Sequence, residues 1–207
     1  MSEKESAKPS ANPTPRALLR AAFVALVSCA FFCASSNASS NASSNASSSA
    51  SSNAAKGPSA PLPAGSAAPD VAGVDQNGQT VRLKELRGKP LLVFFYPKAG
   101  TPGCTKEACA FRDVWQKYQT AGVRIVGVSH DSVADQAAFA REHGFTFPLV
   151  SDSEGNWGQA FGVPLRLWKF YSRVSFLVGR DGKIAKTYLD VDPGVHAGQV
   201  LADASAL

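Results

Sequence analysis

An uninterrupted apolar run, Leu91 to Tyr96, ends at Pro97 and is followed by a loop rich in proline and glycine. A run of helix-forming composition then begins near Cys104. An apolar run of this length predicts a strand that is buried on both faces. A thiol in the first turn of the following helix lies beside unpaired backbone N–H groups and a partial positive charge, and both favour the thiolate. The stretch therefore predicts a buried sheet with a reactive cysteine beyond the end of one strand.

Strand and helix patterns alternate on both sides of this run. We expect a hairpin of two short strands at 71–83, one helical turn at 84–87, strands at 91–96, 123–129, 147–150, 174–178 and 183–189, and helices at 105–120, 132–143 and 194–207. Strands that alternate with helices and end in a hairpin and a helix predict a mixed sheet covered by helices on both faces. The expected class is α/β, with the first hairpin as an N-terminal extension.

The first 34 residues have the pattern of an export leader. Arg16 and Arg20 precede 14 residues, 21–34, that are small or apolar except for Ser28. A bilayer span needs about 20 such residues, so the segment is typical of a secretory signal. Residues 26–29, Leu-Val-Ser-Cys, resemble a bacterial lipobox, which predicts cleavage before Cys29, a lipid on that thiol and a membrane-anchored periplasmic protein. An export signal without a lipid and a cytoplasmic protein remain alternatives, and Cys33 has no assigned role.

Residues 35–65 are a low-complexity segment of serine, alanine, asparagine and proline. Such a composition offers too few apolar side chains to offset the entropy of ordering, so it predicts a disordered linker before a domain at 66–207. The formal net charge of the chain is +5, but residues 1–65 carry five basic and two acidic side chains. The domain thus keeps a charge of only +2 and no basic stripe, which argues against nucleic-acid binding.

The loop before Cys104 carries the elements of a site for a ligand with two bonded oxygens. Pro97 ends the strand, and Thr101 supplies a hydroxyl three residues before the thiol. Gly103 lets the backbone close on the helix start, so that its N–H and that of Cys104 can point inward. A guanidinium would lower the thiol pKa and polarise an O–O bond, and Arg173 is the best candidate because it lies at the mouth of the buried strand expected at 174–178.

These residues lie in segments that resemble a known family. YPKAGTPGCTKEACAFRD (96–113) resembles the active-site segment of the peroxiredoxins, in particular the bacterioferritin comigratory protein/peroxiredoxin Q group. Residues 127–152, 173–184 and 191–201 resemble later segments of the same group. The resemblance covers about residues 66–207 and not 1–65. It implies a thioredoxin-like fold and a peroxidase that is often monomeric and needs no cofactor or metal.

The resemblance also implies roles for individual residues. They are Cys104 as the peroxidatic cysteine, Cys109 as the resolving cysteine that forms a disulfide with it, Thr101 as a hydrogen-bonding group, Pro97 as the residue that shapes the loop, Arg173 as the activating arginine and Glu107 in a supporting role. The substrates would be hydrogen peroxide and organic hydroperoxides. The reductant would be a separate thioredoxin-like dithiol protein, because the chain has no C-x-x-C of its own.

The spacing of the two cysteines has a mechanical consequence. Residues five apart on an α-helix are separated by about 7.5 Å of rise and a net rotation of about 140°. A disulfide needs Cα atoms within about 7 Å and converging side chains. We therefore expect residues 104–110 to unwind whenever Cys104 and Cys109 become linked.

Two other thioredoxin-like functions remain as alternatives. A disulfide reductase would carry C-x-x-C at the helix start, whereas this chain has C-x-x-x-x-C. A membrane-tethered copper chaperone of the Sco type uses C-x-x-x-C and a distant histidine, and the spacing here is one residue longer. The three histidines have ordinary interpretations: His130 in a loop, His143 at a helix end and His196 on the surface of a first helical turn.

Overall fold

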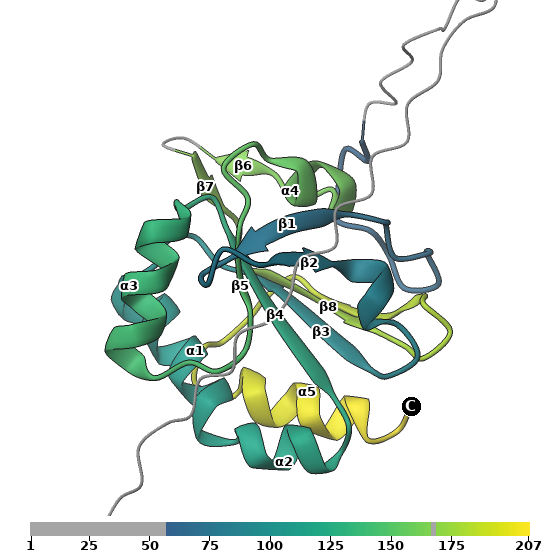
Figure 1. The fold of residues 1–207 in the computed structure, drawn as a ribbon. Helices are drawn as coiled ribbons and strands as arrows, with labels where there is room; N and C mark the ends of the chain where they lie inside the picture. The colour runs from purple at the N-terminus through teal and green to yellow at the C-terminus, as the bar shows by residue number, and fades with distance from the viewer. Residues whose placement is uncertain (1–56, 167–168) are drawn as a thin grey trace, which may run out of the picture. The chain divides into compact units, whose positions relative to one another are not determined.

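A seven-stranded mixed sheet runs through the part of the chain that the computed structural model describes, residues 57–166 and 169–207 (Figure 1). The strand order is β2-β1-β5-β4-β3-β8-β9. The predicted apolar run forms β3 (Leu91–Phe95), which lies parallel to β4 (Arg124–Ser129) and antiparallel to β8 (Val174–Val178). All five residues of β3 are buried, so the prediction of a strand covered on both faces is confirmed.

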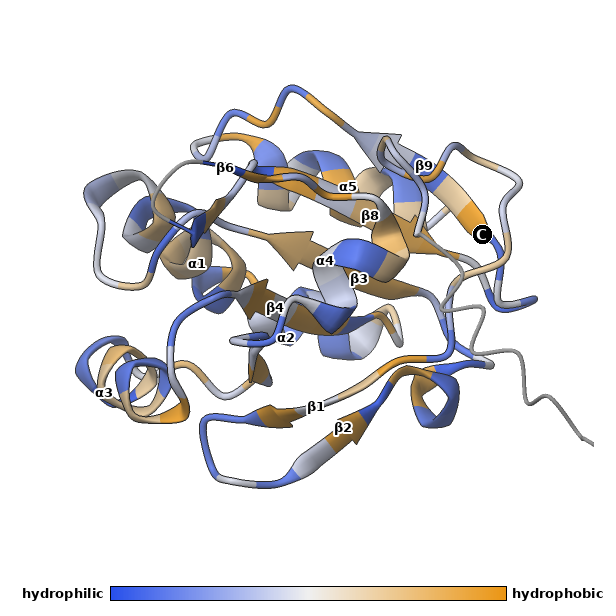
Figure 2. Ribbon diagram, turned by 90° about the horizontal axis from the view of Figure 1, so that it is seen from above, coloured by the Kyte–Doolittle hydropathy of each residue, from blue (hydrophilic) through white to orange (hydrophobic). Residues whose placement is uncertain are grey.

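The two faces of β3 belong to two separate hydrophobic cores. Leu92 and Phe94 pack on the side of the helices, together with buried residues such as Phe111 and Val200. Leu91, Val93 and Phe95 pack on the opposite side. The alternation follows from the period of two in a strand, and it needs an apolar residue at every position because both faces are covered. Figure 2 shows the inner strands in hydrophobic colours, whereas the surrounding helices alternate between hydrophilic and hydrophobic residues.

The outer strands complete the sheet much as predicted. The first hairpin, β1 (Ala72–Asp75) and β2 (Thr80–Arg82), forms one edge, and β9 (Ile184–Tyr188) forms the other. Strand β5 (Leu149–Ser151) begins two residues later than predicted. Residues 147 and 148 are apolar but do not join the strand. Phe147 packs into the core from the preceding loop, and Pro148 has no N–H to donate to a neighbouring strand.

The helix predicted at 105–120 is two helices. α1 (Pro102–Asp113) begins three residues earlier than expected, and α2 (Trp115–Thr120) follows a break at Val114. The early start follows from Pro102 at the first helical position, where its fixed φ is favourable and its missing N–H costs nothing. The break follows the backbone of Val114 (φ −105°, ψ 10°), whose carbonyl accepts the first bonds of α2.

The remaining predicted helices are present with shorter ends. α3 (Val133–His143) is capped by Ser132, whose side chain accepts a hydrogen bond from the Asp135 amide, and it ends at Gly144 in the left-handed conformation. α5 (His196–Ala204) starts two residues later than predicted, and the turn expected at 84–87 is a 3₁₀ helix, η1 (Leu83–Leu86). Helices α1, α2, α3 and α5 contribute to the core that contains Phe94.

The opposite core is covered by elements that the sequence did not predict. They are α4 (Asn156–Phe161) and a separate two-stranded hairpin, β6 (Leu165–Arg166) and β7 (Phe170–Tyr171). The buried carboxylate of Asp152 joins them, because it accepts hydrogen bonds from the amides of Trp157 and Gly158 and from the Tyr171 hydroxyl at 2.6 Å. A six-residue helix and two-residue strands are too short to show a periodicity in the sequence.

Two glycines in helices offer a matched pair of substitutions. A Cβ at Gly158 in α4 would lie 2.3 Å from the ring of Tyr171, which is itself buried. A Cβ at Gly198 in α5 would meet nothing within 4 Å. We expect Gly158→Ala to lower the free energy of unfolding in urea by about 1–3 kcal/mol through overpacking. Gly198→Ala is expected to raise it by about 0.4–1 kcal/mol, and equal effects of the two changes would contradict the packing described here.

Hydrogen bonds to the sheet begin before residue 66. Leu62 donates its amide to the Phe161 carbonyl and accepts a bond from the Thr187 hydroxyl, and the Gly65 amide bonds to Ile184. The end of the predicted linker is thus attached to the domain. The predicted leader, with Cys29 and Cys33, and the rest of the linker lie outside the described residues. In the part that is described, no helix has both the length and the apolar character needed to cross a bilayer.

Candidate active site

Cys104 lies in the first turn of α1, beyond the end of β3, and its side chain is 1% exposed. Thr101 is the residue that caps this helix, and its carbonyl accepts the Thr105 amide at 2.8 Å. The amides of Gly103 and Cys104 donate no hydrogen bond within the described ranges. Free N–H groups at a helix N-terminus favour negative charge, so the thiol lies where a thiolate is stabilised.

Arg173 meets Cys104 although the two residues are 69 positions apart in the sequence. Phe95 at the end of β3 is paired with Val174 at the start of β8, so the segment after β3 and the residue before β8 reach the same edge of the sheet. The Arg173 Nη2 lies 3.3 Å from the Cys104 Sγ. A Cβ at Gly103 would lie 3.3 Å from the same nitrogen, so a residue without a side chain fits best at this position.

Glu107 is the third charged member of the site and is completely buried, one turn along α1 from Cys104. Its Oε2 pairs with the Arg173 Nη1, and its Oε1 has no hydrogen-bond partner in the described part of the chain. Burial raises the pKa of Glu107 to about 7, although Arg173 acts in the opposite direction. Burial disfavours the charge of Arg173, but the Glu107 carboxylate and the Cys104 thiolate outweigh it and raise the pKa of the guanidinium.

The raised pKa of Glu107 gives a prediction for stability against pH. Its ordinary pKa is 4.5 and its value in the fold is about 7, so between these values the folded chain holds a proton that the unfolded chain has lost. The free energy of unfolding therefore falls, by at most about 1.4 kcal/mol per pH unit, as pH rises through this window. We expect Glu107→Gln to remove that fall, measured by urea unfolding of the reduced protein from pH 4.5 to 7.5.

The wild-type protein must be compared with Glu107→Gln because His196 changes the free energy of unfolding with pH in the opposite direction. Burial lowers its pKa from 6.5 to about 4, so its contribution to the free energy of unfolding rises with pH between these values. The variant keeps His196, and the difference between the two stability curves isolates Glu107. Parallel curves would show that Glu107 is ionised throughout.

Thr101 and Pro97 lie in the loop between β3 and α1. The Thr101 hydroxyl donates to the Lys98 carbonyl at 2.9 Å, so its hydrogen is used inside the loop and its oxygen is left as an acceptor. The sequence predicted that the Thr101 hydroxyl can bond a substrate oxygen. In this arrangement the Thr101 oxygen can accept a hydrogen bond from a protonated substrate oxygen. Pro97 is half-buried at the start of the same loop.

Cys109 lies on α1 with Cys104, and both thiols are free. Cys109 is half-buried, whereas Cys104 is buried. Because α1 is continuous from Pro102 to Asp113, the pair is separated as the helical spacing requires, and the structure shows the dithiol form.

The prediction that His196 lies on the surface is wrong. Its side chain is 1% exposed, its Nε2 lies 2.9 Å from the Ser175 hydroxyl, and its ring packs edge-on against Phe111 and Tyr188. The first turn of α5 faces α1 and the sheet, which the sequence pattern did not reveal. Among the described residues, no group of three or more histidine, cysteine or acidic side chains could hold a metal ion.

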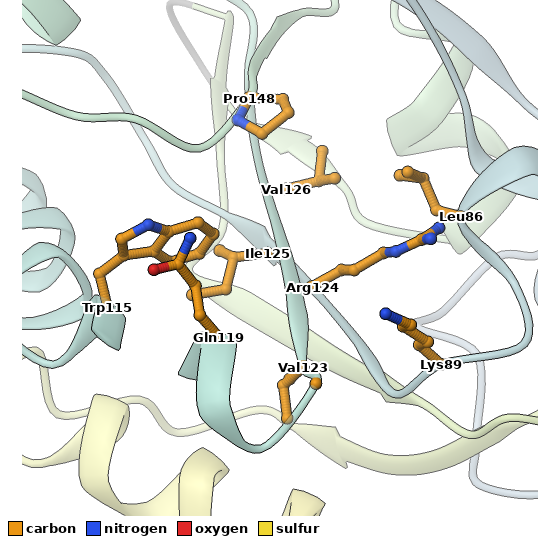
Figure 3. Close-up of a pocket in the computed structure, with 10 residues that line it drawn as sticks. Leu86, Lys89, Trp115, Gln119, Val123, Arg124, Ile125, Val126 and Pro148 are labelled. Atoms are coloured by element: carbon orange, nitrogen blue, oxygen red, sulfur yellow. The ribbon is translucent and has the colours of Figure 1, made fainter. Parts of the chain in front are cut away.

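A separate pocket of about 350 Å³ lies away from this chemistry (Figure 3). Trp115 and Gln119 line one side of β4, and Lys89 and Arg124 line the other. Arg124 is paired with the first residue of β3, whereas Cys104 follows the last one, so the pocket and the thiol lie at opposite ends of the sheet. The pocket therefore does not contribute to the thiol site.

Comparisons with known proteins identify relatives of this chain. A profile of the AhpC/TSA family matches residues 64–187. Peroxiredoxin Bcp of Escherichia coli (strain K12) is 39% identical over 147 residues, which cover 68% of this chain and 94% of that protein. Chloroplastic peroxiredoxin Q of Triticum aestivum is 38% identical over 139 residues, or 66% of this chain. The match spans only 64% of the length of the wheat protein.

Solved structures show the same fold. The crystal structure of peroxidoxin BcpB from Mycobacterium tuberculosis has a TM-score of 0.66 at 36% identity, and the match covers 70% of this chain and 98% of that one. Peroxiredoxin Q from Xanthomonas campestris has a TM-score of 0.65 at 32% identity, with 69% and 97% covered. The architecture is therefore the thioredoxin-like peroxiredoxin fold. With the thiol, the arginine and the buried glutamate brought together at the start of α1, the chain belongs to the AhpC/TSA family, within its bacterioferritin comigratory protein/peroxiredoxin Q group.

Proposed function

We propose that the protein is a thiol peroxidase that reduces hydrogen peroxide and organic hydroperoxides at Cys104. The observation that carries this proposal is the contact between the Arg173 guanidinium and the Cys104 sulfur, 3.3 Å apart at the N-terminus of α1. A fixed positive charge beside a nearly buried thiol stabilises the nucleophile and the oxyanion that leaves it. The names of the relatives, peroxiredoxin Q and peroxiredoxin Bcp, support the same activity.

The first step forms an S–O bond and breaks the O–O bond. The Cys104 thiolate attacks one peroxide oxygen, which stays on sulfur as a sulfenic acid. The other oxygen leaves as an alkoxide or hydroxide and takes a proton, giving an alcohol or water. Arg173 and the free amides of Gly103 and Cys104 are the donors positioned to stabilise the developing negative charge.

The second step uses Cys109. Its thiolate attacks the sulfenic sulfur of Cys104, the S–O bond breaks, and the hydroxyl leaves as water after it takes a proton. The resulting disulfide is reduced by a separate thioredoxin-like dithiol protein, which is itself oxidised to a disulfide. The spacing supports this step only if the start of α1 unwinds, because residues five apart on an intact helix do not face each other.

Peroxide consumption separates this proposal from the copper chaperone. Purified reduced protein is mixed with hydrogen peroxide or cumene hydroperoxide, and thiols and remaining peroxide are counted, with and without thioredoxin and its reductase. We expect one peroxide consumed per protein without the reductant and continuous turnover with it. Uptake of Cu(I) with no loss of peroxide would overturn the proposal. Turnover of an insulin disulfide without loss of peroxide would favour a disulfide reductase instead.

The resemblance to the peroxiredoxins implied organic hydroperoxides as substrates, and one solved structure adds support for them. The bacterioferritin comigratory protein of Xanthomonas campestris, 31% identical with a TM-score of 0.64, is described in terms of its alkyl peroxide reduction activity. Comparing the second-order rate constants for hydrogen peroxide and cumene hydroperoxide tests this point.

We also propose that the protein is exported and lipid-anchored through Cys29. The support is the pattern of residues 16–34 alone. Export would place the reaction beyond the reach of a cytoplasmic reductant, so the dithiol partner would be a periplasmic one. Cell fractionation and fatty-acid labelling of the full chain and of Cys29→Ala test the proposal, and an unlabelled cytoplasmic wild-type protein would overturn it.

A further inference from the structure

We propose that Asp131 is a positioning residue that holds the loop carrying Pro97 and Thr101 in its reactive form. The inference rests on the proposed peroxidase function. Asp131 lies after β4, 27 residues from Cys104 in the sequence, and it plays no part in the steps described above. Its carboxylate lies beside the loop and accepts the backbone amide of Ala99 at 2.8 Å.

This bond is the main tether of the loop. Within the described ranges, the hydrogen bonds of residues 97–101 otherwise stay inside the loop, from the Thr101 hydroxyl to the Lys98 carbonyl, or lead into α1, from the Thr105 amide to Thr101. Neither of these bonds connects the loop to an element other than α1, the helix that directly follows it. The Ala99 amide is thus the point at which the peptide backbone of the loop is bound to the neighbouring strand end.

Asp131 is itself held on more than one side. The same oxygen, Oδ2, accepts the Ser129 hydroxyl at 2.7 Å, and the Asp131 carbonyl accepts the Ser151 hydroxyl at 2.7 Å. Ser129 is fully buried at the end of β4, and Ser151 lies at the end of the neighbouring strand β5. A carboxylate that accepts from two fixed donors has little freedom to rotate, and hydrogen bonds to a charged acceptor are stronger than neutral ones.

A chain of buried groups then returns to the residue before Pro97. The Ser129 hydroxyl oxygen accepts from the side-chain Nε2 of Gln136 at 2.7 Å, and the Gln136 Oε1 accepts the Tyr96 hydroxyl. Burial raises the pKa of Tyr96 above its ordinary range, so the phenol stays a neutral donor. The network therefore binds the chain on both sides of Pro97, through the Tyr96 side chain and the Ala99 backbone.

The consequence for the reaction lies in the geometry of the loop. Thr101 is two residues beyond the tether and caps α1, and Cys104 follows in the first turn. A loop released at Ala99 could no longer fix the Thr101 oxygen relative to the sulfur, and displacement of a reacting group by about 1 Å can cost roughly 100-fold in rate. The sulfur itself would keep its contact with Arg173, because Arg173 directly precedes β8 and does not belong to the loop.

The test compares two reactions of the same thiol. For Asp131→Ala, we expect the second-order rate constant of Cys104 with hydrogen peroxide to fall by roughly 10- to 100-fold. The rate constant for alkylation of the reduced Cys104 thiol by iodoacetamide should change by less than about threefold, because this reaction needs no peroxide oxygen held beside Thr101. Hydrogen exchange should show the Ala99 amide exchanging faster. Asp131→Asn keeps an acceptor oxygen and should recover most of the peroxide rate. This variant also provides the test if Asp131→Ala folds poorly.

Asp135→Asn is the matched control. Asp135 lies in the first turn of α3, and its carboxylate accepts the Ser132 hydroxyl, whereas the Ala99 amide bonds to Asp131, so its variant should react at the wild-type rate. A peroxide rate within about twofold of wild type in Asp131→Ala, or an equal fall of the peroxide and alkylation rates, would overturn the positioning role. If the wild-type protein consumes no peroxide, the proposed function fails. If it does and Asp131→Ala matches it, only this inference fails.

Discussion

Replacing Cys104 by serine is expected to abolish peroxide consumption. The hydroxyl of serine has almost no anionic form at neutral pH and lacks the nucleophilicity of a thiolate. The N-terminus of α1 and Arg173 cannot compensate for this loss of nucleophilicity. The measurement is the loss of cumene hydroperoxide over time with excess thioredoxin and thioredoxin reductase. Cys104 is buried, but serine is close to it in size, so Cys104→Ser should fold. Unfolding in urea checks this.

The companion variant Cys109→Ser is expected to behave differently. It keeps Cys104 and should consume one equivalent of peroxide, leaving a sulfenic acid that a dimedone probe can label. Without Cys109 no intramolecular disulfide forms, so turnover with the dithiol protein should be lost or much reduced. Full activity of Cys104→Ser would end the assignment of the peroxidatic thiol. Full cycling of Cys109→Ser would assign the resolving role to another thiol.

The change from dithiol to disulfide should also be visible in α1. Hydrogen exchange is expected to be faster at residues 104–110 in the oxidised protein than in the reduced one, because the helix must open for the two sulfur atoms to meet. Amides in β3, which is buried on both faces, serve as the internal reference. Equal protection of the α1 amides in both states would exclude a Cys104–Cys109 disulfide formed by local unwinding.

Replacing Arg173 by alanine is expected to lower the second-order rate constant with peroxide by about 10²–10³, the usual cost of losing one donor to a developing oxyanion. Arg173→Lys keeps the charge but not the two-pronged geometry that contacts both Cys104 and Glu107, so an intermediate rate is expected. Stopped-flow measurement of thiol oxidation at a fixed pH gives the constants. Arg180→Ala, at an exposed turn, is the control and should react like wild type.

Loss of Arg173 also leaves the Glu107 carboxyl buried without its partner. Removing one member of a buried ion pair costs up to about 3–5 kcal/mol of folding free energy. The double variant Arg173→Ala, Glu107→Gln removes the stranded acid. It should therefore regain stability in urea without regaining the peroxide rate. If both recover together, Arg173 acts on the rate through stability and not through contact with the reacting atoms.

Much of the fold could be predicted from local patterns. The buried run at 91–96, the hairpin at 71–83 and the helix at 132–143 each depend on a few adjacent residues, and all three are present with small changes at their ends. The elements that were not predicted share a cause. α4, the β6–β7 hairpin and the break at Val114 are short or have no local marker. α4 and β7 are joined by hydrogen bonds to the Asp152 carboxylate, which lies outside both elements.

The candidate site divides in the same way. Cys104, Thr101 and Pro97 lie close together in the sequence, so their spacing alone predicted a shared loop and helix start. The surroundings of Glu107 depend on which face of α1 turns inward, and those of His196 depend on how α5 packs against α1. Side-chain burial between two helices is decided by their packing, and neither sequence segment encodes it alone.

The sequence by itself determined the chemistry: a thiol at a helix N-terminus, a second thiol five residues on, and a loop that lets backbone amides approach. These properties are local, because capping, turn geometry and helical spacing act over a few residues. Only the tertiary structure decided how Arg173 and Asp131 reach this loop. The antiparallel pairing of β3 with β8 brings the guanidinium to the sulfur, and the parallel pairing of β3 with β4 brings the carboxylate to Ala99. Both contacts arise from strand register, which depends on how distant segments pair across the whole sheet.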